Sequence, residues 1–82
     1  MSSLYEFPQY RKLQDKSYYK IVSLLEMYEV QRLGTRWFVL HLLAHNFLDK
    51  NLIQDLLETD EGRYSIISEE EYTSVERYAI TQ

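Results

Sequence analysis

The spacing of apolar residues predicts that most of the first half of this chain is helical. Gly34 follows this segment directly, and it suits the left-handed residue that ends many helices. Between residues 16 and 33, five apolar positions keep the i, i+3, i+4, i+7 spacing of a single helix face: Tyr18, Ile21, Val22, Leu25 and Tyr28. We therefore expect a helix over residues 16–33, which could be entered already at residue 9.

A second apolar segment follows immediately. Residues 36–46 are apolar on nearly every side, which is typical of a central helix, and Thr35 is a suitable N-cap for it. A third, shorter helix is expected over residues 52–58, with Asp49 or Asn51 as its cap. Residues 59–62, with the sequence Thr-Asp-Glu-Gly, then predict a turn.

The C-terminal residues predict a short extended segment followed by a helix. Tyr64, Ile66 and Ile67 form a β-like run, so residues 63–67 are expected to be extended. Ser68 and Glu71 match the Ser-x-x-Glu capping box, which predicts a helix over residues 69–79. The alternative is a strand over residues 72–80 that forms a hairpin with residues 63–67.

Together these patterns predict a mostly α fold. The expected architecture is a single domain over residues 1–82, built as a small bundle of three to four helices with a short extended segment near residues 63–67. Residues 1–7 are expected to be flexible.

Residues 60–79, DEGRYSIISEEEYTSVERYA, resemble the wing and the following helix of winged-helix repressors of the PadR or MarR type. In those proteins a Tyr-rich strand leads through a Thr- or Ser-Glu-Glu turn into the last helix. The resemblance implies a winged-helix-like α+β fold with a C-terminal hairpin, and a DNA-binding function. Residues 52–58, which would enter the groove, contain no Lys or Arg but include Asp55 and Glu58. DNA contact would then fall to basic residues elsewhere.

Composition narrows the classes of function. The 82 residues include no cysteine and two glycines, so the chain has no disulfide, no thiolate ligand or nucleophile, and no glycine-rich phosphate loop. Its longest apolar run is far shorter than the roughly 20 residues of a membrane span, and its first residues do not resemble a signal peptide. We expect a cytoplasmic, non-enzymatic protein with no cofactor and no membrane contact.

Two histidines raise the question of a metal site. His41, His45 and Asp49 are spaced four residues apart, which would place them on one face of a helix, as in some zinc sites. The residue after His41 is Leu42, however, where the metalloprotease motif needs glutamate, and no further histidine or cysteine exists to complete a tetrahedral site within one chain. A metal site shared by two copies is the alternative. These three residues are weak metal candidates, and a core helix is the preferred interpretation.

The charges are unevenly distributed along the chain. Residues 1–41 contain six Lys or Arg against four acids, whereas residues 42–82 contain three against nine. Basic side chains bind phosphates, and neighbouring tyrosines can stack on exposed bases. A nucleic-acid-binding transcription regulator with a winged-helix or helix-turn-helix core is therefore the alternative function, and its candidate contacts are Arg11, Lys12, Lys16, Arg32 and Arg36.

The chain also has many large aromatic rings for its size, including eight tyrosines. A chain this short buries only about 60–65% of its extended surface, and aromatic-rich exposed patches often mark interfaces. The first functional hypothesis is therefore a small protein-interaction or regulatory module that binds another protein or a second copy of itself. Its candidate contact residues are Tyr18, Tyr19, Trp37, Tyr72 and Tyr78.

Overall fold

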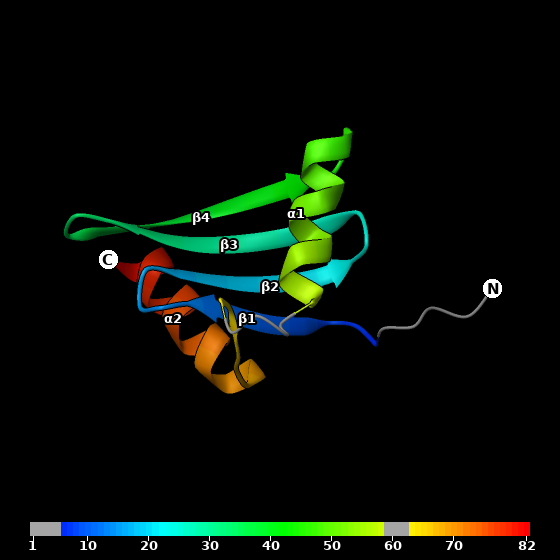
Figure 1. Cartoon of the computed structure of the whole chain (residues 1–82). Coiled ribbons are helices and arrows are strands. Elements are labelled where there is room, and N and C mark those ends of the chain that lie inside the picture. Colours follow the sequence, from blue (N-terminus) through cyan, green and yellow to red (C-terminus); the bar gives the residue numbers. More distant parts are fainter. Residues whose placement is uncertain (1–5, 59–62) are drawn as a thin grey trace.

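In the computed structural model, which describes residues 6–58 and 63–82, the chain forms a five-stranded antiparallel sheet and two helices (Figure 1). The strands follow the order β4-β3-β2-β1-β5 across the sheet. The elements are β1 (Gln9–Leu13), β2 (Ser17–Ser23), β3 (Glu26–Leu33), β4 (Arg36–Leu43), α1 (Phe47–Leu57), β5 (Ser65–Ile66) and α2 (Glu69–Thr81). The protein is thus a small α+β domain, and the prediction of a mostly α helical bundle is wrong.

The error lies in the first half of the chain. The helix predicted over residues 16–33 is in fact β2 and β3, and the helix predicted over residues 36–46 is β4 with the start of the following connection. Gly34 does adopt a left-handed conformation, with φ of 66°. It occupies the first position of the two-residue loop between β3 and β4, where a tight hairpin also favours positive φ.

The strands form a continuous antiparallel meander from β1 to β4. Met27 on β3 lies opposite both Ile21 on β2 and Leu42 on β4. Val30, on the same strand, lies opposite Tyr18 and Val39. Because alternate residues of a strand face opposite sides of a sheet, Met27 and Val30 belong to two rows of side chains on opposite faces.

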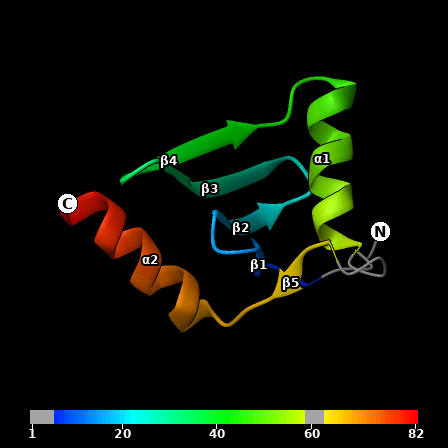
Figure 2. The same ribbon diagram turned by 60° about the vertical axis from the view of Figure 1, so that its left-hand side comes forward.

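Each face of the sheet is covered by one helix (Figure 2). α1 packs on the row that contains Met27, and its core comprises Tyr19, Ile21, Met27, Ala44, Ile53, Leu56 and Leu57. α2 packs on the row that contains Val30, and its core comprises Tyr10, Tyr18, Val30, Tyr72 and Ala79. Both faces of the sheet are therefore apolar.

Several predictions for the later part of the chain are confirmed. The extended segment contains β5, and the last predicted helix is α2, with the Ser68 hydroxyl accepting a hydrogen bond from the Glu71 amide at 3.1 Å. The short third helix is α1, but it begins earlier than predicted because the side chain of Asn46, rather than Asp49 or Asn51, caps it.

Because residues 72–80 are helical, the alternative of a C-terminal hairpin and a winged-helix-like fold is wrong. The turn predicted over residues 59–62 lies outside the described residues, as do residues 1–5 of the segment predicted to be flexible. Within the described ranges, neither helix is long and apolar enough to cross a membrane.

Candidate protein-interaction surface

β4 lies at one edge of the sheet and has β3 as its neighbour on one side (Figure 1). Among residues 6–58 and 63–82, no strand pairs with its outer side. The strand is eight residues long, so its outer side is a long row of backbone groups available to another chain.

The hydrogen-bonding pattern shows which residues of β4 face outward. The Ala44 amide donates to the Leu25 carbonyl at 2.8 Å, one step beyond the pair of Glu26 and Leu43. Paired residues of antiparallel strands alternate between exchanging hydrogen bonds and not doing so. Even-numbered residues of β4 therefore bond to β3, and the backbone groups of Trp37, Val39, His41 and Leu43 point away from the sheet.

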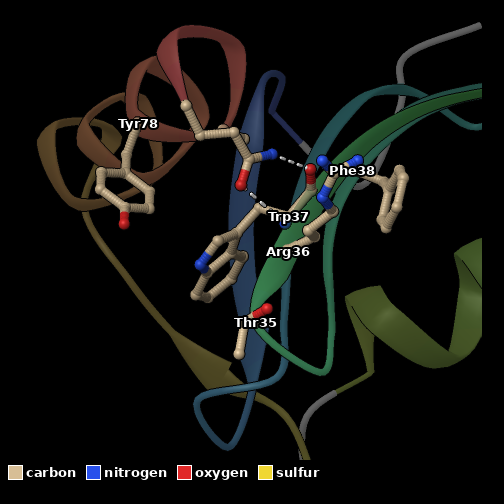
Figure 3. A pocket seen from close by; sticks show the side chains of 7 residues that line it. Thr35, Arg36, Trp37, Phe38 and Tyr78 are labelled. Atoms are coloured by element: carbon tan, nitrogen blue, oxygen red, sulfur yellow. Dashed lines mark hydrogen bonds between the residues drawn. The ribbon is translucent and has the colours of Figure 1, made fainter.

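One of these outward residues is bonded to the side chain of Gln82, next to α2. The Trp37 amide donates to Gln82 Oε1 at 3.1 Å, and Gln82 Nε2 donates to the Trp37 carbonyl (Figure 3). The side-chain amide thus takes the place of a neighbouring strand at Trp37 alone. Within the described part of the chain, the outward backbone groups of Val39, His41 and Leu43 have no such partner.

Apolar side chains of β4 are partly exposed on both faces of the sheet. Phe38 and Leu40 lie on the face that carries α1, whereas Val39 and Leu43 lie on the face that carries α2; all four are between 39% and 47% exposed. Figure 3 shows Trp37 and Phe38 pointing to opposite sides of the strand. We refer to these four side chains, with the outward backbone of Val39, His41 and Leu43, as the β4 surface.

A pocket of about 540 Å³ lies beside the β4 surface, between the β3–β4 hairpin end and α2 (Figure 3). Trp37 and Tyr78 both line it. The centroids of the Trp37 and Tyr18 rings are 6.0 Å apart. The Arg32 guanidinium carbon lies over the Trp37 ring, 6.0 Å from the centroid of that ring. Tyr78 is 60% exposed, so these two predicted contact residues are brought together at an accessible place.

The other three predicted contact residues are part of the core. Tyr18, Tyr19 and Tyr72 are all buried, and the Tyr72 ring packs 5.5 Å from that of Tyr10. Burial, together with the charge of Glu29, raises the pKa of Tyr19 to about 12. These rings stabilise the fold and are not presented to a partner.

The predicted nucleic-acid contacts are divided between different environments. Arg11 is buried: its Nε donates to the Leu56 carbonyl at 3.0 Å and its Nη1 to the Tyr10 carbonyl at 2.9 Å, which places its positive charge at the C-terminal end of α1. Burial lowers the pKa of Arg11. Lys12 Nζ donates a hydrogen bond to the carboxylate of Glu71 at 3.2 Å. This bond and the negative charge of Glu71 raise the pKa of Lys12.

The remaining three basic residues lie near one end of the sheet. Lys16 is in the β1–β2 turn, and its carbonyl accepts a hydrogen bond from the Arg32 amide at 2.8 Å. Arg36 begins β4, three positions after Leu33, which it faces across the hairpin. Lys16 and Arg32 lie on the face that carries α2, whereas Arg36 lies on the opposite face, so the fold brings together only two of the five predicted nucleic-acid contacts.

The weak metal candidates do not share a helix face. His41 is on β4, where its Nε2 lies 2.7 Å from Glu26 Oε2 and its ring stacks on Tyr28 at 4.4 Å. His45 lies in the connection between β4 and α1, and Asp49 is in the first turn of α1. In the described ranges, no group of three or more His, Cys, Asp or Glu side chains is arranged to hold a metal ion.

The exposed apolar residues of β4 were missed because residues 36–46 were interpreted as a central helix. The useful signal was the uninterrupted apolar character of Trp37–Leu40 and Leu42–Leu43. An edge strand usually alternates with polar residues or carries charges. An edge strand with exposed apolar side chains on both faces, such as β4, departs from this pattern.

No protein-family model, curated protein or solved structure matches this chain.

Proposed function

We propose that this protein is a non-enzymatic interaction module that binds another protein chain through the β4 surface. One observation carries this proposal: the longer edge of the sheet combines exposed apolar side chains on both faces with backbone groups that have no partner among residues 6–58 and 63–82. A cytoplasmic location and a regulatory role remain predictions from the sequence.

The physical basis is β-strand addition. A strand from a partner can bond to the outward amides and carbonyls of Val39, His41 and Leu43, which supplies affinity without requiring a particular sequence. The side chains of Phe38 and Leu40 on one face, and of Val39 and Leu43 on the other, would then meet the alternating side chains of the added strand.

Photo-cross-linking tests this proposal. A photoreactive phenylalanine analogue in place of Leu40 should give discrete adducts with another protein chain in an extract of the source cells. The same analogue in place of Asp55, an exposed residue of α1, is the matched control. Equal adduct formation at the two positions, or none at position 40, would contradict the proposal.

Nucleic-acid binding is the second candidate because Lys16 and Arg32 are neighbours at one end of the sheet and Arg36 lies at the same end on the opposite face. Phosphate contacts weaken as salt rises, so such binding should be strongest at low ionic strength. A gel shift at low salt that disappears in an Arg32→Ala/Arg36→Ala variant would support this function. Absence of any shift at low salt would eliminate it.

A further inference from the structure

We infer that the partner of the β4 surface is a second copy of this chain, and that the two β4 strands pair antiparallel about a two-fold axis at His41. This inference rests on the proposed function, because it names the occupant of the same surface. A two-fold interface presents one patch twice, so the patch must complement itself in backbone, side chains and charge. The β4 surface does so in all three respects.

The backbone determines the register. Antiparallel pairing centred on His41 sets His41 opposite its own copy and Val39 opposite Leu43 of the second copy. This register uses all three outward residues that lack partners and leaves the Gln82 side chain bonded to Trp37. Pairing centred on Val39 would instead require Trp37 to bond to His41 of the second copy, which displaces Gln82.

The side chains match in this register on both faces of the sheet. On the face that carries α1, Leu40 lies opposite Leu42 of the second copy. On the face that carries α2, Val39 lies opposite Leu43 of the second copy. Apolar pairs directly opposite one another stabilise neighbouring strands. If two sheets stacked face to face, the apolar side chains on only one face would be covered. Pairing at the edge places apolar side chains of the second copy beside those on both faces.

The charges also favour the antiparallel arrangement. Arg36, at the hairpin end, is the one Lys, Arg, Asp or Glu residue of β4. Antiparallel pairing keeps the two Arg36 side chains at opposite ends of the interface, whereas parallel pairing would bring these like charges together. At the centre, each His41 ring has the carboxylate of its own Glu26 at 2.7 Å.

Single cysteines test both the partner and the register, because the natural chain contains no cysteine. Across a hydrogen-bonded antiparallel pair the Cα atoms are about 5.5 Å apart, within reach of a disulfide. Under mild oxidation, His41→Cys should convert to a disulfide-linked dimer. Val39→Cys alone should not, since its two copies would be offset by roughly 13 Å along the strand. A mixture of Val39→Cys and Leu43→Cys should link, and Leu24→Cys in the β2–β3 turn is the control.

Light scattering on the untagged protein completes the test. The wild-type protein should have twice the mass of one chain, and Val39→Pro should halve that mass. The proline removes an outward amide but none of the bonds to β3. If the far-UV circular dichroism of Val39→Pro shows loss of the sheet, Leu43→Lys serves as the second variant and should halve the mass likewise.

A monomeric wild-type protein, or a His41→Cys protein that links no faster than Leu24→Cys, would overturn this inference. Cross-linking of position 40 to a different protein would in that case leave the proposed function in place. Absence of both self-association and cross-linking at position 40 would contradict the two proposals together.

Discussion

The two edges of the sheet are built very differently. β5, at one edge, is two residues long and pairs with β1 through Arg11 and Lys12. β4, at the other edge, is eight residues long, and from Trp37 to Leu43 it contains no proline and no Lys, Arg, Asp or Glu. Proteins usually protect sheet edges by making them short or by placing charges or proline on them. The first device is used at β5, and none of these devices is used over residues 37–43.

This contrast is the basis of our proposal that the β4 edge binds a partner. The interior near β5 and β1 is closed by the packing of Tyr10 against Tyr72 and by the buried hydrogen bonds of Arg11. At β4 the one backbone cover is the Gln82 side chain on Trp37, within the described residues. We therefore expect the β1 side of the molecule to supply most of the stability and propose that the β4 side binds the partner.

The largest expected loss of stability comes from a substitution in the core on the β1 side of the molecule. Tyr72 is 1% exposed, and Tyr72→Ala should lower the free energy of unfolding by about 3–5 kcal/mol, as for other large core aromatics. Leu40→Ala, at the β4 edge, should lower the free energy of unfolding by less than about 1 kcal/mol in dilute solution. Urea unfolding followed by circular dichroism measures both variants. Similar losses would contradict the division of roles between the two sides.

The next largest effect is expected from alkaline pH, which should lower the free energy of unfolding through the buried Tyr19. The pKa of Tyr19 is raised to about 12 in the folded protein, whereas an unfolded tyrosine ionises near 10. The neutral ring is therefore favoured by folding, so this contribution is complete below pH 10 and is lost as the pH rises from 10 to 12. Tyr19→Phe should have a flatter dependence of unfolding free energy on pH across that window. An equally steep dependence in the variant would contradict the assignment.

Removing the cap of α2 should have a moderate effect. Ser68→Ala removes the acceptor for the Glu71 amide and should lower the free energy of unfolding by about 1 kcal/mol. Ser74 is exposed in the middle of the same helix, and Ser74→Ala should change it by less than about 0.5 kcal/mol. Thermal unfolding compares the two. If Ser74→Ala is the more damaging change, the Ser68 cap does not stabilise the helix as described.

The smallest effect on stability is expected at Gln82, whose side chain bonds to the outward backbone of Trp37 at the edge of the sheet. Gln82→Ala should lower the free energy of unfolding by less than about 1 kcal/mol, because exposed hydrogen bonds contribute little net stability. It should nevertheless speed hydrogen exchange of the Trp37 amide, which loses its acceptor. Gln82→Glu keeps an acceptor oxygen and should preserve more of that protection. An unchanged Trp37 exchange rate in Gln82→Ala would show that Gln82 does not cover the edge.

The parts of the fold that could be predicted from the sequence depend on local chemistry. The cap at Ser68, the helical spacing after it and the β-like run before it all act within a few residues, and they predicted α2 and the segment containing β5 correctly. The apolar face of α1 was also recognisable. Its start was not, because Asn46 was not recognised as the capping residue.

The strands were missed because both faces of the sheet are covered. In β2 and β3, apolar residues for the two cores occur at both odd and even positions, so the alternation of a half-exposed strand is absent and the density suits a helix. The β2–β3 turn, at Leu24 and Leu25, contains no residue typical of a turn. The enrichment in Tyr, Val, Ile and Trp was the available sign of strands.

The fold places only part of the predicted set of contact residues near the β4 edge. Chain length and aromatic content predict a surplus of apolar surface, and two of the aromatic residues proposed as contacts, Trp37 and Tyr78, line the pocket beside the β4 surface. Which rings are buried depends on strand register, and sequence alone did not supply the register. Tyr18, Tyr19 and Tyr72 were therefore proposed as contacts although they belong to the core.

Hydrogen exchange of individual backbone amides, measured on the wild-type protein over a range of concentrations, tests the central claim most directly. In dilute solution the amides of Val39, His41 and Leu43 should exchange rapidly, whereas those of Leu40 and Leu42, bonded to β3, should be protected throughout. As the concentration rises, the three outward amides should become protected together. Rapid exchange of these three amides at every concentration, or their protection in a sample that light scattering shows to be monomeric, would contradict an edge that pairs with a second copy.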